Sequence, residues 1–304
     1  MTSAVTTGVD SSGSRAAVWL AAARPRTLPA AVAPVAVGTA CAHAAGGVAW
    51  GPAAAALIGA LLLQIGTNFA NDVFDAEHGA DTPDRKGPVR AVATGLISAR
   101  AMRAAMIATF AAAVAVGGYL TAVAGWPVIA IGAASIAAGV AYTGGPWPLG
   151  YHGLGDVFVF AFFGLVAVAA TAWVQVGAVP ALALWLAVPV GAIATAILVV
   201  NNLRDRQTDA RVGKRTLAVR FGRRFALAEY AALLAIAHAV PVGLALTGRP
   251  AIALAAITAP RAVQLFVALV RAEPGPAVNR LLGATAGLLL VQSALLTAGV
   301  IASA

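Results

Sequence analysis

Long apolar runs, separated by short breaks rich in glycine, proline or charge, make up most of this chain of 304 residues. Each run is about 18 or more residues long, enough for a helix to cross a bilayer core of about 30 Å. Backbone groups in lipid must be satisfied internally, so the runs are expected to be helices. Runs such as LIGALLLQIG do not alternate, which argues against a membrane β-barrel. The pattern predicts nine spans, at about residues 28–47, 50–71, 102–124, 127–143, 156–177, 180–200, 225–247, 250–270 and 281–302.

Composition agrees with a polytopic membrane protein, because 61% of the residues are hydrophobic, 10% are charged and the mean hydropathy is +0.87. Many apolar positions are alanine, so eight or ten spans are alternatives. Residues 1–23 are expected to form a disordered cytoplasmic tail, and 24–304 a single transmembrane domain. A cleavable signal peptide starting near Arg24 is disfavoured, because its apolar run begins far from Met1 and contains prolines. Cys41 is the single cysteine, which excludes an intrachain disulfide.

Basic residues test the span model independently. If the N-terminus is cytoplasmic, 18 of the 20 Lys and Arg residues fall on the cytoplasmic side. Arg249 falls outside, and Arg261 falls within a span, where an ionisable residue suggests function unless the span boundary is misplaced. This asymmetry is what the positive-inside rule predicts. The net charge of +9 is therefore an orientation signal, and no basic domain points to nucleic acid.

Acidic residues gather behind the second and sixth predicted spans. Each group forms one helix face, at spacings i, i+4, i+7 and i, i+4, i+8, and the members are Asn68, Asp72 and Asp75, then Asn201, Asp205 and Asp209. The second group begins 133 residues after the first and forms a weak internal repeat. Even-numbered spans return the chain to the same face, so both groups are expected at one site.

This arrangement has a chemical reading. Clustered carboxylates repel one another unless a cation lies between them, and oxygen ligands without His or Cys suit Mg²⁺, so all six residues are candidate metal ligands. Flanking cations would hold phosphate oxygens: Arg85, Lys86, Arg90, Lys214 and Arg215. Together these features predict a diphosphate site whose ligand carries a lipid tail. The alternative is that the acids are solvated loop residues that balance the basic excess, but two groups matched in spacing and side argue against it.

Four ordered stretches resemble the UbiA superfamily of intramembrane prenyltransferases, and within it the branch that acts on 1,4-dihydroxy-2-naphthoate in menaquinone synthesis. They are RPRTLPAAVAPVAVGTA, NFANDVFDAEHGADTPDRKGPVRAVATGLIS, YTGGPWPLGYHGLGDVFVFAFFG and NNLRDRQTDARVGKRTLAVRFG, from about residue 24 to 224. The later spans match in hydropathy alone. The resemblance implies an all-α bundle of nine helices around a central cavity, in a bacterial-type cell membrane, with two Asp-rich motifs binding Mg²⁺ and diphosphate on the cytoplasmic face.

The resemblance also implies an activity and residue roles. A polyprenyl group would pass from polyprenyl diphosphate to dihydroxynaphthoate, with loss of CO₂ and pyrophosphate, giving demethylmenaquinone. No protein partner is expected. The catalytic candidates are Asp72, Asp205, Lys214 and Tyr142. The substrate-binding candidates are Arg85, Lys86, Arg90, Arg215, Tyr151, Asn202 and Asp81. Lys214 and the neighbouring arginines would stabilise the departing pyrophosphate.

Two departures from the superfamily pattern leave choices open. Ala76 occupies a position that is acidic in ubiquinone-type members, so Asp75 or Asp81 would supply the remaining carboxylate. Pro146 replaces the lysine that follows the tyrosine, here Tyr142, in related aromatic prenyltransferases. The π faces for an allylic cation are expected from Tyr142, Trp147, Tyr151, Phe162 and Phe163, with an ordinary interfacial aromatic belt as the alternative.

The sequence is also compatible with other functions. The same metal site would suit another acceptor, such as 4-hydroxybenzoate, haem or a chlorophyllide, and a transporter of an anionic lipid is a further alternative. Asp156 is expected to be a residue of a helix N-terminus, with substrate contact as the alternative. The four histidines lie at no metal-ligand spacing and are expected to be structural.

Overall fold

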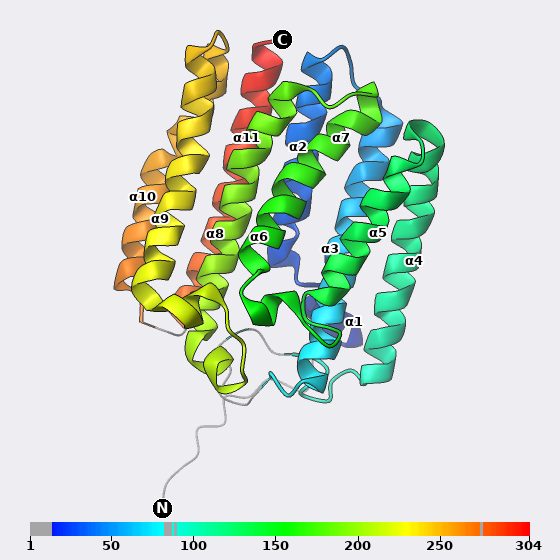
Figure 1. Cartoon of the computed structure of the whole chain (residues 1–304), viewed down its shortest axis with the longest axis vertical. Helices are drawn as coiled ribbons and strands as arrows, with labels where there is room; N and C mark the ends of the chain where they lie inside the picture. Colours follow the sequence, from blue (N-terminus) through cyan, green and yellow to red (C-terminus); the bar gives the residue numbers. More distant parts are fainter. Residues whose placement is uncertain (1–13, 82–86, 88–89, 274–275) are drawn as a thin grey trace, which may run out of the picture.

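The bundle is all-helical throughout the part of the chain that the computed structural model describes, which is residues 14–81, 87, 90–273 and 276–304. Figure 1 shows the long helices running roughly parallel, with α1 at the lower end and the C-terminus at the upper end. The predicted all-α class is confirmed.

Each predicted span coincides with a helical segment. The segments are α2 (Pro29–Ala44), α3 (Trp50–Glu77), α4 (Ala99–Ala124), α5 (Pro127–Ala141), α6–η3–α7 (Gly155–Val159, Phe160–Val166, Ala167–Val176), α8 (Ala181–Arg211), α9 (Leu217–Leu246), η4–α10 (Pro250–Thr258, Ala259–Arg271) and α11 (Pro276–Ala302). By length and apolarity, seven of the described segments qualify as spans, or eight if α2 is joined to the bent helix before it. The segment α5 has 15 residues, about 22 Å, so nine is an approximate count.

Local sequence explains where several helices begin and end. Proline stands in the first turn of α2 and of α5, where its missing N–H costs nothing. The side chains of Ser98 and Thr216 accept hydrogen bonds from backbone N–H groups in the first turns of α4 and α9. Gly177 ends α7 at φ 72°, and Gly222 interrupts α9 at φ 82°, both in the region that favours glycine.

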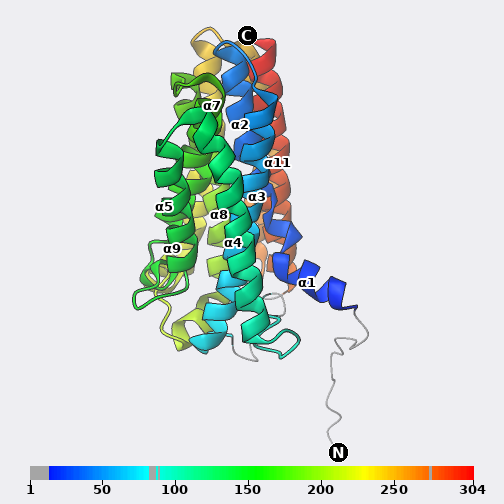
Figure 2. The same ribbon diagram turned by 90° about the vertical axis from the view of Figure 1, so that its right-hand side faces the viewer.

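The N-terminal expectation needs a correction. Residues 15–23, placed in the disordered tail, form α1 (Arg15–Ala23), which η1 (Pro25–Thr27) connects to α2 across a bend of 49° (Figure 2). Ser14 caps the helix, and the Trp19 ring meets Phe69 of α3 edge-on, with 5.8 Å between centroids. Val18, Ala22 and Ala23 pack against the same core cluster as Trp19, and this apolar face holds the segment against the bundle.

The helix α8 forms the centre of the larger core cluster, and 72% of the residues in its most apolar stretch are buried. It packs against α2, α9, α11 and the π-helical segment η3. A Cβ on Gly164 of η3 would lie 2.7 Å from the Cα of Gly191, so the two backbones touch because neither residue has a side chain there. This close packing fixes the position of α8 and of the acids at its far end.

Both acid-bearing helices are longer than predicted. The helix α3 continues to Glu77 instead of ending near residue 71, and α8 continues to Arg211 instead of ending near residue 200. The acids therefore lie on regular turns of the same helices, and they continue the helical periodicity of the apolar part. The ends of α3, α5 and α8 lie together at the lower end of the bundle in Figure 1, which we call the acid end.

Candidate functional site

The first acidic group lines the interior face of α3 at the acid end. Asn68, Asp72 and Asp75 are only 3%, 2% and 2% exposed. The Asn68 amide nitrogen donates to the carbonyl oxygen of Ala23 at 2.9 Å and to the Thr27 hydroxyl at 3.0 Å. Both amide hydrogens are used, so the amide oxygen is the atom that a metal ion would take.

Asp72 holds the chain that returns from α3 toward α4. Its carboxylate accepts backbone N–H groups from Ala91 at 3.2 Å and from Val92 at 3.1 Å. The backbone at Ala91 and Val92 is thereby held against α3.

Three segments that are far apart in sequence meet at Asp75. Its carboxylate accepts from the Arg90 guanidinium at 2.7 Å, the Lys214 ammonium at 2.9 Å and the Tyr151 hydroxyl at 3.0 Å. The Lys214 ammonium also lies 4.5 Å from the centre of the Tyr151 ring. The second motif thus contributes Lys214 to the first, across 139 residues.

Tyr151 is held in its neutral, donating form. The residue lies in η2 (Leu149–His152), and its backbone carbonyl accepts the N–H of Arg215 at 2.8 Å. Burial, followed by the charge and hydrogen bond of Asp75, raises the pKa of the phenol above its ordinary range. Tyr151 therefore remains a hydrogen-bond donor to Asp75 at physiological pH.

The second acidic group is already paired with a cation. The Arg204 guanidinium donates to both carboxylate oxygens of Asp205, and Arg204 is 4% exposed. It also donates to the side-chain oxygens of Asn201 and Asn279, each at 2.8 Å. Asn202 is buried beside this network, and Asp209 is half-buried. Three polar side chains on α8 and α11, those of Asn201, Asp205 and Asn279, are therefore arranged around one arginine.

The remaining candidates divide into three groups. Asp81 forms an ion pair with Arg90 at 3.3 Å, so Asp75 and Asp81 share one guanidinium and both stay candidates for the remaining carboxylate ligand. Arg215 approaches the site through its backbone, while its side chain is exposed. Arg85 and Lys86 lie outside the described residues.

A large apolar cavity opens beside this cluster. Its volume is about 1010 Å³, at the upper end of the range for small-molecule pockets, about 300–1,000 Å³. It is lined by α2, α3, α4, α5 and α6–η3–α7. Tyr142 lines it where α5 ends at the acid end, and Trp173 lines it near the opposite end of α7. The cavity therefore follows the length of the bundle.

Some of the aromatic candidates line this cavity and others lie outside it. Tyr142, Phe162 and Phe163 line it, whereas Tyr151 faces the acid cluster. Trp147 is 54% exposed and stacks on His152, with 4.1 Å between ring centroids. It lies outside the lining of the cavity, which agrees with an interfacial aromatic residue.

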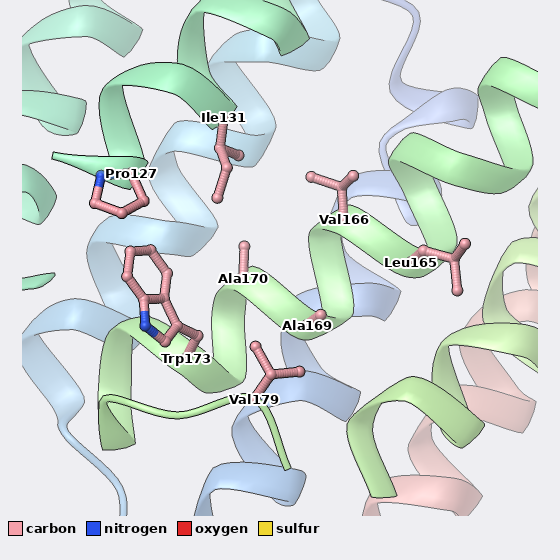
Figure 3. A pocket seen from close by; sticks show the side chains of 8 residues that line it. All are labelled: Pro127, Ile131, Leu165, Val166, Ala169, Ala170, Trp173 and Val179. Atoms are coloured by element: carbon pink, nitrogen blue, oxygen red, sulfur yellow. The ribbon is translucent and has the colours of Figure 1, made fainter. Parts of the chain in front are cut away.

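A second, shallower groove lies between α5 and α7 (Figure 3). Its volume is about 470 Å³, and Pro127 and Ile131 face Trp173 across it. Four residues line both this groove and the large cavity: Ile131, Val166, Ala170 and Trp173. These side chains separate the two spaces.

The donor set fits a hard cation held together with a phosphate ligand. Among the described residues, no group of three or more His, Cys, Asp or Glu side chains has the arrangement of a metal cage. Mg²⁺ is usually held by one or two carboxylates, water and substrate phosphates, and carboxylate and amide oxygens are its preferred protein ligands. The acids at the acid end are of that type, and their present partners include Lys214, Arg90 and Arg204.

Two residues of this site, Arg204 and Asn279, were not predicted from the sequence. Arg204 stands inside the second motif, and its spacing of three from Asn201 is a helical contact that was available as a signal. Asn279, 75 residues further along the chain, has no pattern that points to α8.

The fold and site define a class: a multi-pass helical membrane protein with a buried charged cluster at one end of an apolar cavity. Residues 31–298 match the model of the UbiA prenyltransferase family, and the chain belongs to that family. Similar chains include a protein of Mycobacterium leprae, 38% identical over 93% of this chain and 95% of its own length. Others come from Mycobacterium tuberculosis, 44% identical over 73% and 75%, and from Escherichia coli, 43% identical over 73% and 74%.

Each of these three relatives carries the name 1,4-dihydroxy-2-naphthoate octaprenyltransferase. The fold is shared with a UbiA homolog from Archaeoglobus fulgidus, at 17% identity and a TM-score of 0.63 over 92% of this chain and 99% of that one. The same homolog has been solved bound to GPP and Mg²⁺, and that structure matches with a TM-score of 0.61 over 92% and 99%.

Replacing Arg204 by methionine is expected to destabilise the protein by about 3–5 kcal/mol, because it leaves the Asp205 carboxylate buried without its cation. Thermal unfolding in detergent measures the effect. The double variant Arg204→Met with Asp205→Asn is the control, and it is expected to regain a large part of the loss. A single variant as stable as the wild type would show that the pair is not buried as described.

Proposed function

We propose that this protein transfers a polyprenyl group from polyprenyl diphosphate to 1,4-dihydroxy-2-naphthoate, giving the hydroquinone form of demethylmenaquinone, CO₂ and pyrophosphate. The observation that carries the proposal is the buried cluster around Asp75 beside an apolar cavity of about 1010 Å³. The cluster suits a diphosphate and the cavity suits its tail. The names of the relatives supply the acceptor.

The cations at Asp75 are suited to a change of partner. Lys214 and Arg90 share that carboxylate, so an incoming diphosphate offers them further anionic oxygens. Arg85, Lys86, the Arg215 side chain, Asn202 and Asp81 are assigned to the same substrate. The acid end would then exchange internal ion pairs for contacts with the substrate.

Magnesium would join the two motifs through the carboxylates of Asp72, Asp75, Asp205 and Asp209 and the amides of Asn68 and Asn201. When bound, it supplies positive charge that offsets the charge of the departing pyrophosphate. Lys214 stabilises the same charge directly, and the ring of Tyr142 faces the cavity where the allylic cation forms. Cavity walls from α4 and α5 exclude water from that cation.

The acid end is assigned to the cytoplasm. The basic residues of the sequence concentrate in the segments that join helices at this end, whereas Arg249 follows α9 at the opposite end. The positive-inside rule places such an end in the cytoplasm, with the N-terminus on the same side.

Purified protein given polyprenyl diphosphate, dihydroxynaphthoate and Mg²⁺ is expected to form demethylmenaquinone and to release CO₂ and pyrophosphate. Chromatography of the quinone and capture of labelled CO₂ measure the products. Removal of divalent metal with EDTA is expected to stop the reaction, and added Mg²⁺ to restore it. Absence of product with every aromatic acceptor tried would overturn the enzymatic proposal.

Asp72→Asn and Asp205→Asn are each expected to lower kcat at least about 100-fold, because each removes a carboxylate assigned to the metal. The asparagine side chain keeps the size of the original and an acceptor oxygen, and thermal unfolding in detergent checks that each variant is folded at the temperature of the assay. The matched control is Glu77→Gln, an exposed acid at the end of α3 that pairs with Arg103. Near-normal turnover in either aspartate variant would refute the metal assignment.

Gly132→Leu is expected to shift substrate preference toward shorter prenyl chains by about tenfold or more in relative kcat/KM. Gly132 lines the large cavity, and a Cβ there meets no atom within 4 Å, so the new side chain fills empty space. Gly243→Leu is the matched control, since Gly243 of α9 is equally open but does not line the cavity. An unchanged preference would show that the prenyl tail lies elsewhere.

A further inference from the structure

Asp156 is a buried carboxylate that the proposed metal and diphosphate site does not use. It stands in the first turn of α6 and is 6% exposed. Its Oδ1 atom makes no hydrogen bond to any of the described residues. Buried polar atoms almost always have a partner, so an orphaned carboxylate oxygen points to a group that arrives with a ligand.

The position of Asp156 relates it to both the cavity and the acid end. A Cβ on the preceding residue, Gly155, would lie 2.9 Å from the Tyr142 hydroxyl, and Tyr142 lines the cavity. Val159, one turn further along the same helix face, also lines the cavity. Asp156 does not itself line the cavity; it lies next to Gly155 and one turn from Val159, beside the end of the cavity that Tyr142 lines.

The surroundings of Asp156 differ from those of the other acids at this end. Asp75 contacts Arg90 and Lys214, and Asp205 contacts Arg204. Among the described residues, no lysine, arginine or histidine forms a salt bridge with Asp156. Carboxyl groups in one site can take different roles when their environments differ in this way.

We propose that Asp156 is the general base for the aromatic acceptor, and that its unpartnered oxygen receives the proton of the acceptor hydroxyl adjacent to the ring carboxylate. This inference rests on the proposed function, because it takes the acceptor to be 1,4-dihydroxy-2-naphthoate. A base at this point raises the electron density of the ring carbon that bears the carboxylate, beside the cavity where the allylic cation forms.

The step balances without a further reactant. The hydroxyl proton moves to Asp156 as the ring carbon bonds to the allylic carbon, whose bond to the diphosphate oxygen breaks with the electron pair leaving on pyrophosphate. The ring now holds a ketone next to a carbon that bears both the prenyl group and the carboxylate. Loss of CO₂ returns its electron pair to the ketone oxygen, which takes the proton back from Asp156. The hydroquinone form of the product results, and the base is regenerated.

Asp156→Asn is expected to lower kcat about 10²- to 10⁴-fold, the usual contribution of a general base, while the affinity for polyprenyl diphosphate with Mg²⁺ is retained. In the wild type, kcat should fall at low pH as the base becomes protonated. This fall should be absent in the variant. In Asp156→Ala, added formate should restore part of the turnover by taking the vacated position. Glu229→Gln is the control and should stay active, because its carboxyl is on another helix and half-exposed.

The outcomes separate this inference from the proposed function. A wild-type protein without prenyl transfer would refute the function itself. An active wild type together with near-normal turnover in Asp156→Asn would refute the role of Asp156 alone. Loss of diphosphate binding in Asp156→Asn, or no formate rescue in Asp156→Ala, would assign Asp156 a structural role and also overturn the inference.

Discussion

The acid end of this bundle is organised by one buried carboxylate, Asp75, and the groups that neutralise it. An ionised carboxylate 2% exposed is unstable unless cations and donors surround it. Lys214, Arg90 and Tyr151 meet that requirement, and they come from the segment after α8, the segment before α4 and the turn η2. Satisfying one charge thus brings four parts of the chain to the same place.

The bundle makes this convergence possible by carrying its helices beyond the apolar spans. The helices α3 and α8 each continue past the last apolar turns, so their acids keep the orientation of the buried face. The contact between Gly164 and Gly191 holds α6–α7 tightly against α8. The apolar cavity lies on the other side of α6–α7, toward α4 and α5, where packing is looser. Tight packing on one side and open space on the other place the cavity beside the charges.

The sequence indicated much of this arrangement, because helical periodicity and charge are local properties. The spacings of Asn68, Asp72 and Asp75 indicated one helix face, and all three are buried together. Other features depend on tertiary contacts that no spacing reveals. Adjacent residues on a helix do not normally face each other, so Arg204 beside Asp205 gave no sign of an ion pair. The segment Arg15–Ala23 could not be placed from sequence, because its order depends on tertiary contacts: its apolar side chains pack against the core cluster of α3 and α4, and Asn68 donates to the Ala23 carbonyl.

The pairing of acids with arginine and lysine also explains how such a site can exist before substrate binds. Without a cation, the carboxylates would repel one another in a region of low dielectric constant. The protein supplies its own cations, and those at Asp75 and Asp205 are guanidinium and ammonium groups, which also suit phosphate. Under the proposed function, a diphosphate arriving with Mg²⁺ would replace each partner with one of the same sign: metal for the carboxylates, phosphate for the cations. The charges would then be compensated both before and after the substrate binds. The same residues would stabilise the free protein and bind the diphosphate.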